Sequence, residues 1–259
     1  MARRVEAHVR ASWNERPGGV LRLAAAGFAT GAGIRNLMYD SGVLASRQAP
    51  VPIVSVGGLT AGGSGKTPIA ADIAGRLSET GIPTAVVTHG FADEMDVHRK
   101  LSPECRVYGG PGRLQLARQA AEEGARLVVL DSGFQHRRLH RDLDIVTVEE
   151  RTLGLRLAHL PAGPYREGLE SLARADVVVS VRRDLPASDE PREPRASGSA
   201  ARRSLADRLA DLPGTPSLVA ARIRPGCAVA ANEAARGVPE PTPALAVAGI
   251  MWPEVFFAQ

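Results

Sequence analysis

The segment from Ser55 to Pro68 reads SVGGLTAGGSGKTP, and its residue types and spacing suggest the clearest chemistry in the chain. Glycines allow a backbone to wrap closely around phosphate oxygens, and the N-terminus of a following helix adds its dipole. A lysine and a threonine at the end of such a loop reach the β- and γ-phosphates of ATP and a Mg²⁺ ion, respectively. The residues of this predicted ATP-binding loop are Thr60, Ala61, Gly62, Gly63, Ser64, Gly65, Lys66 and Thr67, and Thr67 is the predicted metal ligand.

The loop departs from the strict phosphate-loop pattern at Thr60, where that pattern has glycine. The strand-loop-helix context still favours phosphate binding over a glycine-rich turn without a ligand. Lys66 and Lys100 are the only lysines among the 32 lysine and arginine residues. A lysine retained in so arginine-rich a chain indicates a position where the planar guanidinium does not fit.

A second element, Leu127–Asp131, is an apolar run that ends in a carboxylate. Many buried strands end in aspartate, but after a phosphate loop such a residue typically supports Mg²⁺. We therefore predict that Asp131 binds the metal. The basic run His136–Arg141 follows closely, and it could either steer an anionic substrate or form a solvated turn.

The elements that position these residues follow from the alternation of short β-branched runs with helical stretches after Val51. This alternation predicts an α/β fold of the P-loop NTPase type, with a mostly parallel sheet flanked by helices. We expect helices after Lys66 and between Gly112 and Glu123. The expected strands are Pro52–Val56, Thr84–Thr88, Leu127–Leu130, Ile145–Val148, Val177–Val181, Ser217–Ile223 and Ala244–Ala248.

The N-terminal region carries the whole excess of positive charge. Residues 1–47 contain seven arginines and three acidic residues, a balance equal to the formal net charge of +4. Such an arm suits an anionic membrane surface, where each basic residue contributes about 1 kcal/mol. The stretch Val20–Ile34 predicts a helix that either lies in the membrane interface or packs on the core. No apolar run reaches the length of a membrane span, and no motif indicates nucleic-acid binding.

Composition divides the chain into four regions. Residues 1–47 form the basic arm with its interfacial helix, and residues 48–183 form the phosphate-loop core. Residues 184–216 are polar and low in complexity, which predicts a linker or a mobile surface segment. Residues 217–259 would begin a small, incomplete C-terminal lobe.

The loop and the segment 131–146 (DSGFQHRRLHRDLDIV) together resemble the tetraacyldisaccharide 4'-kinase family of lipid A synthesis. Further matches lie at 160–167 (LPAGPYRE), 175–179 (ADVVV) and 248–257 (AGIMWPEVFF). The resemblance implies ATP-dependent phosphorylation of the 4'-hydroxyl of an acylated glucosamine disaccharide 1-phosphate. It also implies a peripheral location at the cytoplasmic face of the bacterial inner membrane. The two cysteines agree with a reducing compartment, because they stand in no disulfide or metal-ligand spacing.

The resemblance also implies roles for individual residues. Gln135, His136, Arg166 and Glu167 match family positions that line the catalytic site, and Glu167 matches a metal ligand. The general base of the family is an aspartate in a Gly-Asp-Glu segment. The match here is Asp93 in an Ala-Asp-Glu segment after a shortened loop. The alternatives are that the base is Asp96, or that the aspartate is a solvated loop carboxylate without a catalytic role.

Three departures from the family pattern lead to competing hypotheses. Ser132 stands where the family has a second aspartate, which predicts weaker magnesium binding. His89 stands where the family has an arginine. The family's histidine partner of the base lies beyond Gln259, so His89 or His98 would have to replace it. The leading hypothesis is the lipid kinase, and the alternative is a non-catalytic or weakly active nucleotide-binding paralogue. A kinase or synthetase of a soluble metabolite would leave the N-terminal arm unexplained.

Overall fold

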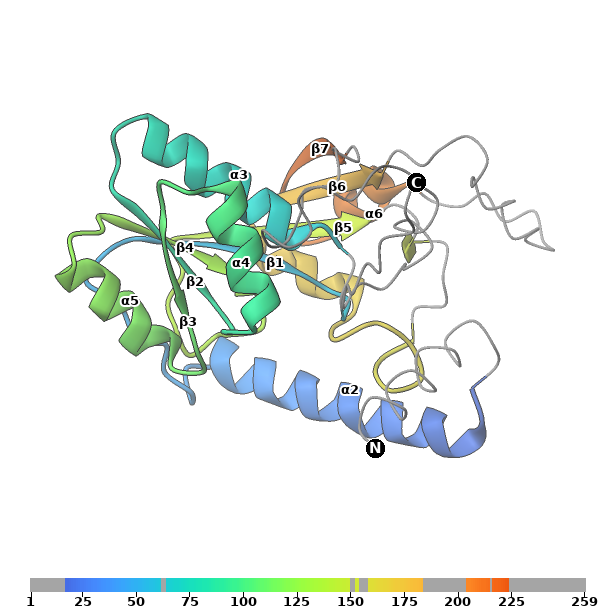
Figure 1. The fold of residues 1–259 in the computed structure, drawn as a ribbon. Coiled ribbons are helices and arrows are strands. Elements are labelled where there is room, and N and C mark those ends of the chain that lie inside the picture. Colours follow the sequence, from blue (N-terminus) through green and yellow to red (C-terminus); the bar gives the residue numbers. More distant parts are fainter. Residues whose placement is uncertain are drawn as a thin grey trace.

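The computed structural model describes residues 17–61, 64–149, 152–153, 158–183, 204–214 and 216–223, with the backbone alone at Asp93, Arg183, Arg222 and Ile223. Its centre is a seven-stranded sheet in the order β3-β2-β4-β1-β5-β6-β7, in which every neighbouring pair is parallel (Figure 1). The strands are β1 (Ile53–Gly58), β2 (Thr84–Thr88), β3 (Arg106–Gly109), β4 (Leu127–Asp131), β5 (Leu143–Glu149), β6 (Val177–Arg183) and β7 (Ser217–Ile223). The helices are α2 (Gly19–Asp40), α3 (Lys66–Glu79), α4 (Ala92–Leu101), α5 (Arg113–Glu122), α6 (Leu205–Ala210) and the 3₁₀ helix η2 (Leu169–Arg174).

Helices cover both faces of the sheet, which explains why its strands are apolar on both sides. Val86 and Val87 are adjacent on β2 and point to opposite faces. Val86 belongs to the cluster that α3 fills with Ala70 and Ala74. Val87 belongs to the cluster that α5 fills with residues such as Leu114. A third cluster joins β5 and β6 to η2 and α6. The α/β fold predicted from the sequence is confirmed.

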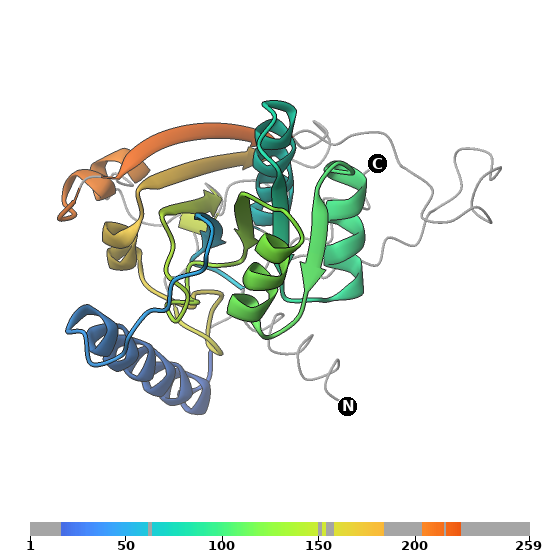
Figure 2. The same ribbon diagram turned by 90° about the vertical axis from the view of Figure 1, so that its left-hand side faces the viewer.

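Helix α2 lies along one side of the molecule, outside the sheet, and is at the bottom of both Figure 1 and Figure 2. It is longer than predicted, and Ala25 is its single buried residue. Its C-terminal half attaches to the core through polar contacts of Arg35 and Asn36. Its other face leaves large apolar side chains exposed, including Val20 and Leu23. One side of this helix therefore contacts the core, and the expectation that it lies in a membrane interface stays a prediction.

Two elements of the core differ from those expected. The strand β3 was not predicted, and its residues are only partly buried at the edge of the sheet. No element was predicted for residues 92–101, and they form the helix α4. The sequence ADEMDVHRKL is polar on average and has no capping side chain at Phe91, so the basic residues in its last turn were its clearest helical signal.

The polar region 184–216 was expected to be a linker, but its described end is folded. Residues Leu205–Ala210 form α6, whose N-terminus is closed by reciprocal hydrogen bonds between Ser204 and Asp207. Leu205 and Leu209 are buried in the core. The following strand, β7, pairs with β6 and extends the same sheet rather than beginning a separate lobe.

The strands Thr84–Thr88 and Ser217–Ile223 have the predicted bounds, and four others agree to within a few residues. The predicted strand Ala244–Ala248 and residues 1–16 of the basic arm lie outside the described residues. Within the described part of the chain, no helix combines the length and the apolar character that crossing a membrane requires.

Candidate active site

The predicted phosphate loop follows the central strand β1 and leads into α3. Gly65, the residue before α3, has a φ of 78°, in the left-handed region that glycine adopts without strain. On its other side the loop is attached to the segment 164–166. The amide of Ala61 donates to Pro164 O at 2.8 Å, and the amide of Arg166 donates to Leu59 O at 2.7 Å. Gly62 and Gly63 lie outside the described residues.

Two glycines at the end of β1 allow close packing behind the loop. A Cβ at Gly57 would stand 2.8 Å from the amide nitrogen of Phe134, and one at Gly58 would stand 2.6 Å from Ser64 Oγ. Ser64 also accepts a hydrogen bond from Lys66 Nζ at 3.0 Å. These contacts hold the described end of the loop against β1, with Lys66 Nζ directed to Ser64.

Asp131 lies beside the loop because β1 and β4 are neighbours, in a register that pairs it with Val56. Its side chain is 1% exposed, and its Oδ2 accepts a hydrogen bond from Thr67 Oγ1 at 2.9 Å. His98 Nε2 lies 2.9 Å from the same oxygen. Burial acts to raise the pKa of Asp131, but hydrogen bonds from His98 and Thr67 and the charge of Lys66 outweigh it and lower the pKa. The carboxylate is therefore ionised at neutral pH.

Ser132, next to this carboxylate, has a φ of 57° although it is not glycine. Its amide donates to Val56 O at 2.8 Å, and its hydroxyl donates to Asp131 Oδ1 at 3.3 Å. The left-handed backbone is costly for most residues but is tolerated by aspartate and asparagine. The position therefore suits a short polar side chain that contacts Asp131.

Positive charge gathers around this carboxylate. Arg113, at the start of α5, is 2% exposed, and its Nη1 donates to the carbonyl oxygens of Asp131 and Ser132 at 3.1 Å each. Its Nη2 is buried and has no hydrogen-bond partner among the described residues. Burial lowers the pKa of Arg113 and of Arg166, yet both remain cations because the reference value is so high. An anion bound beside Arg113 would accept a hydrogen bond from this Nη2.

His89 lies at the end of β2, within electrostatic reach of these cations. Partial burial, followed by the charges of Arg113 and Arg166, lowers its pKa, and Lys66 acts in the same direction. Asp131 acts in the opposite direction. The four charged side chains that influence this imidazole therefore lie within electrostatic range of the carboxyl end of β2, and ligands bind at the carboxyl ends of strands in open α/β sheets.

The family resemblance implies that Gln135, Arg166 and Glu167 line the catalytic site, and each has different contacts in the structure. Gln135 Nε2 donates to Gly58 O at 3.0 Å, which ties it to the base of the phosphate loop. Arg166 belongs to the segment that anchors the loop, through its backbone amide. The Oε2 atom of Glu167 instead accepts hydrogen bonds from Arg174 at 2.6 Å and Asn36 at 3.1 Å. These bonds connect Glu167 to η2 and α2, and its role as a metal ligand stays a prediction.

The predicted general base lies in the first turn of α4, but the side chain of Asp93 is outside the described residues. The neighbouring Glu94 accepts a hydrogen bond from Thr88 Oγ1 at 2.8 Å, which ties α4 to the end of β2. His98, considered above as a partner of this base, contacts Asp131.

The basic run His136–Arg141 is largely structural. Arg137 binds the carboxylate of Asp40 at 2.6 Å, and Arg141 binds that of Asp144 at 2.7 Å. Burial and nearby cations, Arg113 foremost, lower the pKa of His136 to about 4. Two of the three arginines are therefore paired, and the neutral His136 lies against the cationic site.

Sequence reasoning missed the contributions of His98, Glu94 and Arg113. Arg113 begins a helix that was expected, but the sequence gives no sign that its guanidinium is buried beneath β4. His98 and Glu94 belong to α4, for which no element was predicted. A search for charged residues near the start of elements that follow strands would have found Arg113 and Glu94, but not His98.

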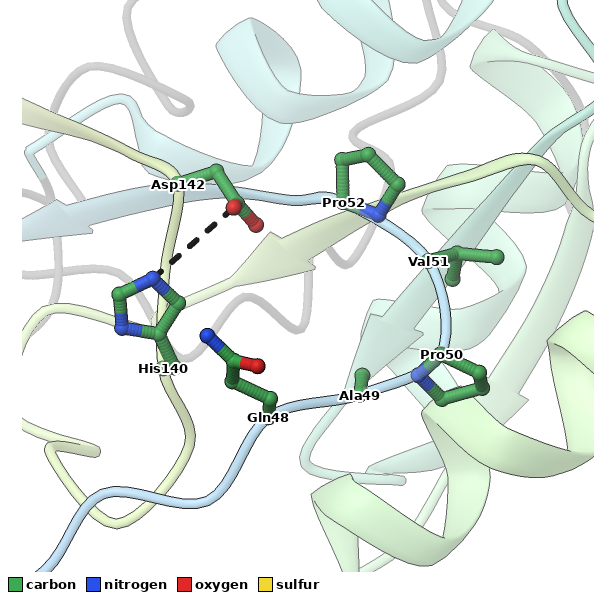
Figure 3. Close-up of a pocket in the computed structure, with 7 residues that line it drawn as sticks. All are labelled: Gln48, Ala49, Pro50, Val51, Pro52, His140 and Asp142. Atoms are coloured by element: carbon green, nitrogen blue, oxygen red, sulfur yellow. Dashed lines mark ion pairs between the residues drawn. The ribbon is translucent and has the colours of Figure 1, made fainter.

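A hollow at the amino ends of the strands, opposite the end that carries the phosphate loop, is separate from this site. It is lined by Gln48, Ala49, Pro50, Val51, Pro52, His140 and Asp142 (Figure 3). These residues precede β1 and β5, so the hollow lies at the amino ends of the strands, whereas the phosphate loop follows their carboxyl ends. Asp142 is engaged there, because its Oδ2 accepts the amide of Ile53 at 2.7 Å.

The donor set at Asp131 fits magnesium better than a transition metal. Within the described part of the chain, no three His, Cys, Asp or Glu side chains form a metal-binding group. Magnesium requires few protein ligands, because it keeps several waters and shares the phosphate oxygens of its nucleotide. The Thr67 hydroxyl and the Asp131 carboxylate supply the hard oxygen atoms that such an ion prefers.

Comparison with known proteins identifies relatives along most of the chain. The profile of the family described as "Tetraacyldisaccharide-1-P 4'-kinase" matches residues 19–104 and 97–259. The tetraacyldisaccharide 4'-kinase of Chlorobaculum parvum is 33% identical over an alignment of length 267, gaps included, that covers 92% of this chain and 69% of that protein. The tetraacyldisaccharide 4'-kinase of Anaeromyxobacter sp. (strain K) is 38% identical over an alignment of length 197, gaps included, that covers 64% of this chain and 52% of that protein.

Among solved structures, a crystal structure of LpxK from Aquifex aeolicus in complex with ATP has a TM-score of 0.55 and 31% sequence identity. The matched region covers 60% of this chain and 56% of that chain. The chain thus spans between 52% and 69% of the length of these three relatives.

Proposed function

Because the chain belongs to the tetraacyldisaccharide-1-P 4'-kinase family, we propose that it transfers the γ-phosphoryl group of ATP to the 4'-hydroxyl of an acylated glucosamine disaccharide 1-phosphate. One observation carries the proposal. Lys66, Thr67 and Asp131 converge at the carboxyl ends of β1 and β4, with Thr67 Oγ1 2.9 Å from Asp131 Oδ2. This arrangement has the parts that bind a nucleoside triphosphate with its metal.

Phosphoryl transfer depends on positioning and charge stabilisation more than on covalent chemistry of the protein. Lys66 and the loop amides bind the terminal phosphates of ATP. Arg113 and Arg166 stabilise the negative charge that spreads over the transferred group. The unpartnered Nη2 of Arg113 supports this role, because a phosphate oxygen would satisfy a buried donor that no described residue satisfies.

The Thr67 hydroxyl and the Asp131 carboxylate would hold a Mg²⁺ ion, which would neutralise part of the phosphate charge. Gln135 supports the loop through Gly58, and Glu167 supports the neighbouring segment through α2 and η2.

Asp93 is the proposed general base that accepts the proton of the 4'-hydroxyl. Proton transfer of this kind contributes about 10²–10⁴-fold to a rate. The start of α4 is a suitable position for it, because Glu94 joins this turn to the end of β2 beside the phosphate site.

The lipid nature of the substrate gives α2 a role at an anionic membrane surface, the cytoplasmic face of the inner membrane. Val20, Leu23, Ile34 and Leu37 are 84%, 76%, 56% and 66% exposed, respectively. At 100° per residue these positions fall on one side of the helix, away from Arg35, which binds the core. This apolar row would enter the interface of the membrane that holds the substrate. Nucleic acid is not a proposed partner.

A single-turnover assay tests the activity. Excess protein is mixed with γ-labelled ATP and vesicles that contain the acylated disaccharide 1-phosphate, and labelled lipid is followed over time. We expect labelled lipid that requires Mg²⁺ and the disaccharide. Tight ATP binding without any labelled lipid would contradict the kinase and favour the non-catalytic paralogue.

Vesicle cosedimentation tests the membrane role separately. Anionic vesicles should carry the protein to the pellet, and a Leu23→Gln, Ile34→Gln double variant should reduce the bound fraction. Ala26→Gln is the matched control, because it adds a polar side chain at another exposed position of α2. Equal binding by all three proteins would exclude this face of α2 as the contact surface.

A further inference from the structure

His98 is an unexpected neighbour of the metal-binding carboxylate. It lies on α4, its side chain is 0% exposed, and its Nε2 is 2.9 Å from Asp131 Oδ2. Its backbone is fixed on the helix, since the amide and the hydroxyl of Ser102 both donate to His98 O, at 2.9 and 3.0 Å. The imidazole is therefore held in place against Asp131 from a different element of the fold.

The direction of this hydrogen bond follows from the state of the carboxylate. An ionised Asp131 only accepts hydrogen bonds, so Nε2 must carry the proton that lies between them. His98 Nδ1 is also buried and has no hydrogen-bond partner among the described residues. A buried polar atom without a partner lowers stability, and an apolar side chain of the same size would avoid that cost. The histidine is thus a poor choice for packing alone, and its favourable contact is the one with Asp131.

The two oxygens of Asp131 are held unequally. Oδ2 accepts hydrogen bonds from both His98 and Thr67 at 2.9 Å, whereas the bond from Ser132 to Oδ1 is longer, at 3.3 Å. His98 therefore fixes the oxygen that receives the Thr67 proton. When that proton points to Oδ2, the lone pairs of the Thr67 hydroxyl are directed elsewhere and remain available to a cation.

We propose that His98 is a positioning residue for the magnesium site: by holding Asp131 Oδ2, it keeps the Thr67 hydroxyl oriented as a ligand of the Mg²⁺ that accompanies a bound nucleoside triphosphate. The inference rests on the proposed ATP-dependent function. It assigns no contact between His98 and the nucleotide, and it predicts that His98 affects the metal rather than the affinity for ATP itself.

The test compares two substitutions that fill the same space. His98→Gln keeps an N–H donor at a similar distance along the side chain, whereas His98→Met has none. ATP affinity is measured by calorimetry with EDTA and then with saturating Mg²⁺, and the ratio of the two affinities is the readout. Because outer hydrogen-bond partners of a metal ligand typically change metal affinity about 10–100-fold, we expect His98→Met to reduce this ratio at least about tenfold. His98→Gln should stay near the wild type, and ATP affinity in EDTA should be the same in all proteins.

His140→Met is the matched control, since its side chain is 46% exposed at the amino ends of the strands. A wild-type ratio in His98→Met would overturn the inference. An equal loss in His98→Gln and His98→Met would also overturn it, because it would show that only the shape of the imidazole matters. If the wild type itself does not bind ATP, the proposed function fails, and that result is distinct from a failure at His98.

A second measurement covers variants that do not fold. In the wild type, ¹⁵N NMR of histidine-labelled protein should show a proton on the Nε2 of His98 that exchanges slowly with solvent. Its resonance should shift when Mg²⁺ is added to the ATP-bound protein. A bare Nε2, or a resonance that Mg²⁺ does not move, would contradict the proposal.

Discussion

The carboxyl ends of β1 and β4 and the junction between α2 and η2 each contain a buried carboxylate, and the two differ in their partners. Asp131, in the first region, is 1% exposed and accepts hydrogen bonds from a hydroxyl and from an imidazole. Glu167, in the second region, is 5% exposed and binds the guanidinium of Arg174 at 2.6 Å. The charge of Glu167 is directly neutralised, whereas the charge of Asp131 remains available to a further cation.

The difference in partners indicates different roles for the two regions: a ligand site in the first and a structural contact in the second. The first region keeps incomplete electrostatics, with an ionised carboxylate and a buried Arg113 Nη2 that lacks a described partner. Such arrangements cost stability and are typical of sites that wait for a ligand. The second region also contains buried atoms without a described partner, Asn36 Oδ1 and Arg174 Nε, but its carboxylate is bound by a guanidinium that lies over the ring of Phe134 at 4.7 Å. A buried acid indicates a metal ligand only where its partners leave it unneutralised.

The largest expected effect is in the first region. Lys66→Ala should weaken ATP binding about 10²-fold, because losing a charge-assisted bond to phosphate costs about 1.5–3 kcal/mol. Calorimetry measures this, and Lys100→Ala is the control, since Lys100 is exposed on α4 and is the only other lysine. Vesicle binding, which belongs to the second region, should not change. Equal ATP affinity in the wild type and in Lys66→Ala would remove the phosphate-loop assignment.

The next largest effect is expected from substituting the two buried carboxylates, Asp131 and Glu167. Asp131→Asn should raise the magnesium concentration needed for half-maximal activity by at least about tenfold. Glu167→Gln should leave that concentration nearly unchanged and lower the free energy of unfolding instead. That loss should be smaller than the ~3–5 kcal/mol that breaking a fully buried ion pair typically costs, because the side chain of Arg174 is 19% exposed. A magnesium titration and urea unfolding of both variants would reveal the reverse pattern if Glu167 were the metal ligand.

Local sequence patterns were sufficient to predict the first region, at the carboxyl ends of β1 and β4, but not the second, at the junction between α2 and η2. A glycine-rich turn between a strand and a helix, and an apolar strand that ends in Asp131, are signals carried by neighbouring residues. The pairing of Glu167 with Asn36 joins residues 131 positions apart. No periodicity or spacing encodes such a contact, so its carboxylate looked like that of Asp131.

The elements that were missed show the same limit. The helix α4 carries charges on most sides and is stabilised by packing against α3 rather than by its own pattern. The helix α6 did have a local signal, a serine followed three residues later by an acid, Ser204 and Asp207, but its polar surroundings hid it. The strand β7 was found, yet its membership of the main sheet depends on pairing with β6.

A smaller effect is expected from pH at a residue that lies between the two regions. The pKa of His136 is lowered to about 4, through burial and then the charges of Arg113 and Arg35, one from each region. The unfolded chain has the ordinary value of about 6.5, so it binds more protons than the folded chain between these values. This contribution to stability is complete above about pH 6.5 and is lost as the pH falls through about 4. Urea unfolding at pH 7 and pH 5 should show a larger loss for the wild type than for His136→Gln, and equal losses would contradict this.

The smallest expected effect is that of Ser132→Asp, which should strengthen metal binding when Mg²⁺ is present and lower stability when Mg²⁺ is absent. An aspartate at this position tolerates the φ of 57° and places a second charge beside Asp131. With Mg²⁺ present, Ser132→Asp should lower the half-maximal magnesium concentration about fivefold, which matches the roughly 1 kcal/mol that opposite charges about 4 Å apart gain in water-like surroundings. With EDTA, the two carboxylates repel each other, so the variant should unfold at a lower temperature than the wild type. Ser132→Asn keeps the shape without the charge and should show neither change. If Asp and Asn behave alike under both conditions, charge at this position has no influence on the metal, and the contrast between the two regions rests on Asp131 alone.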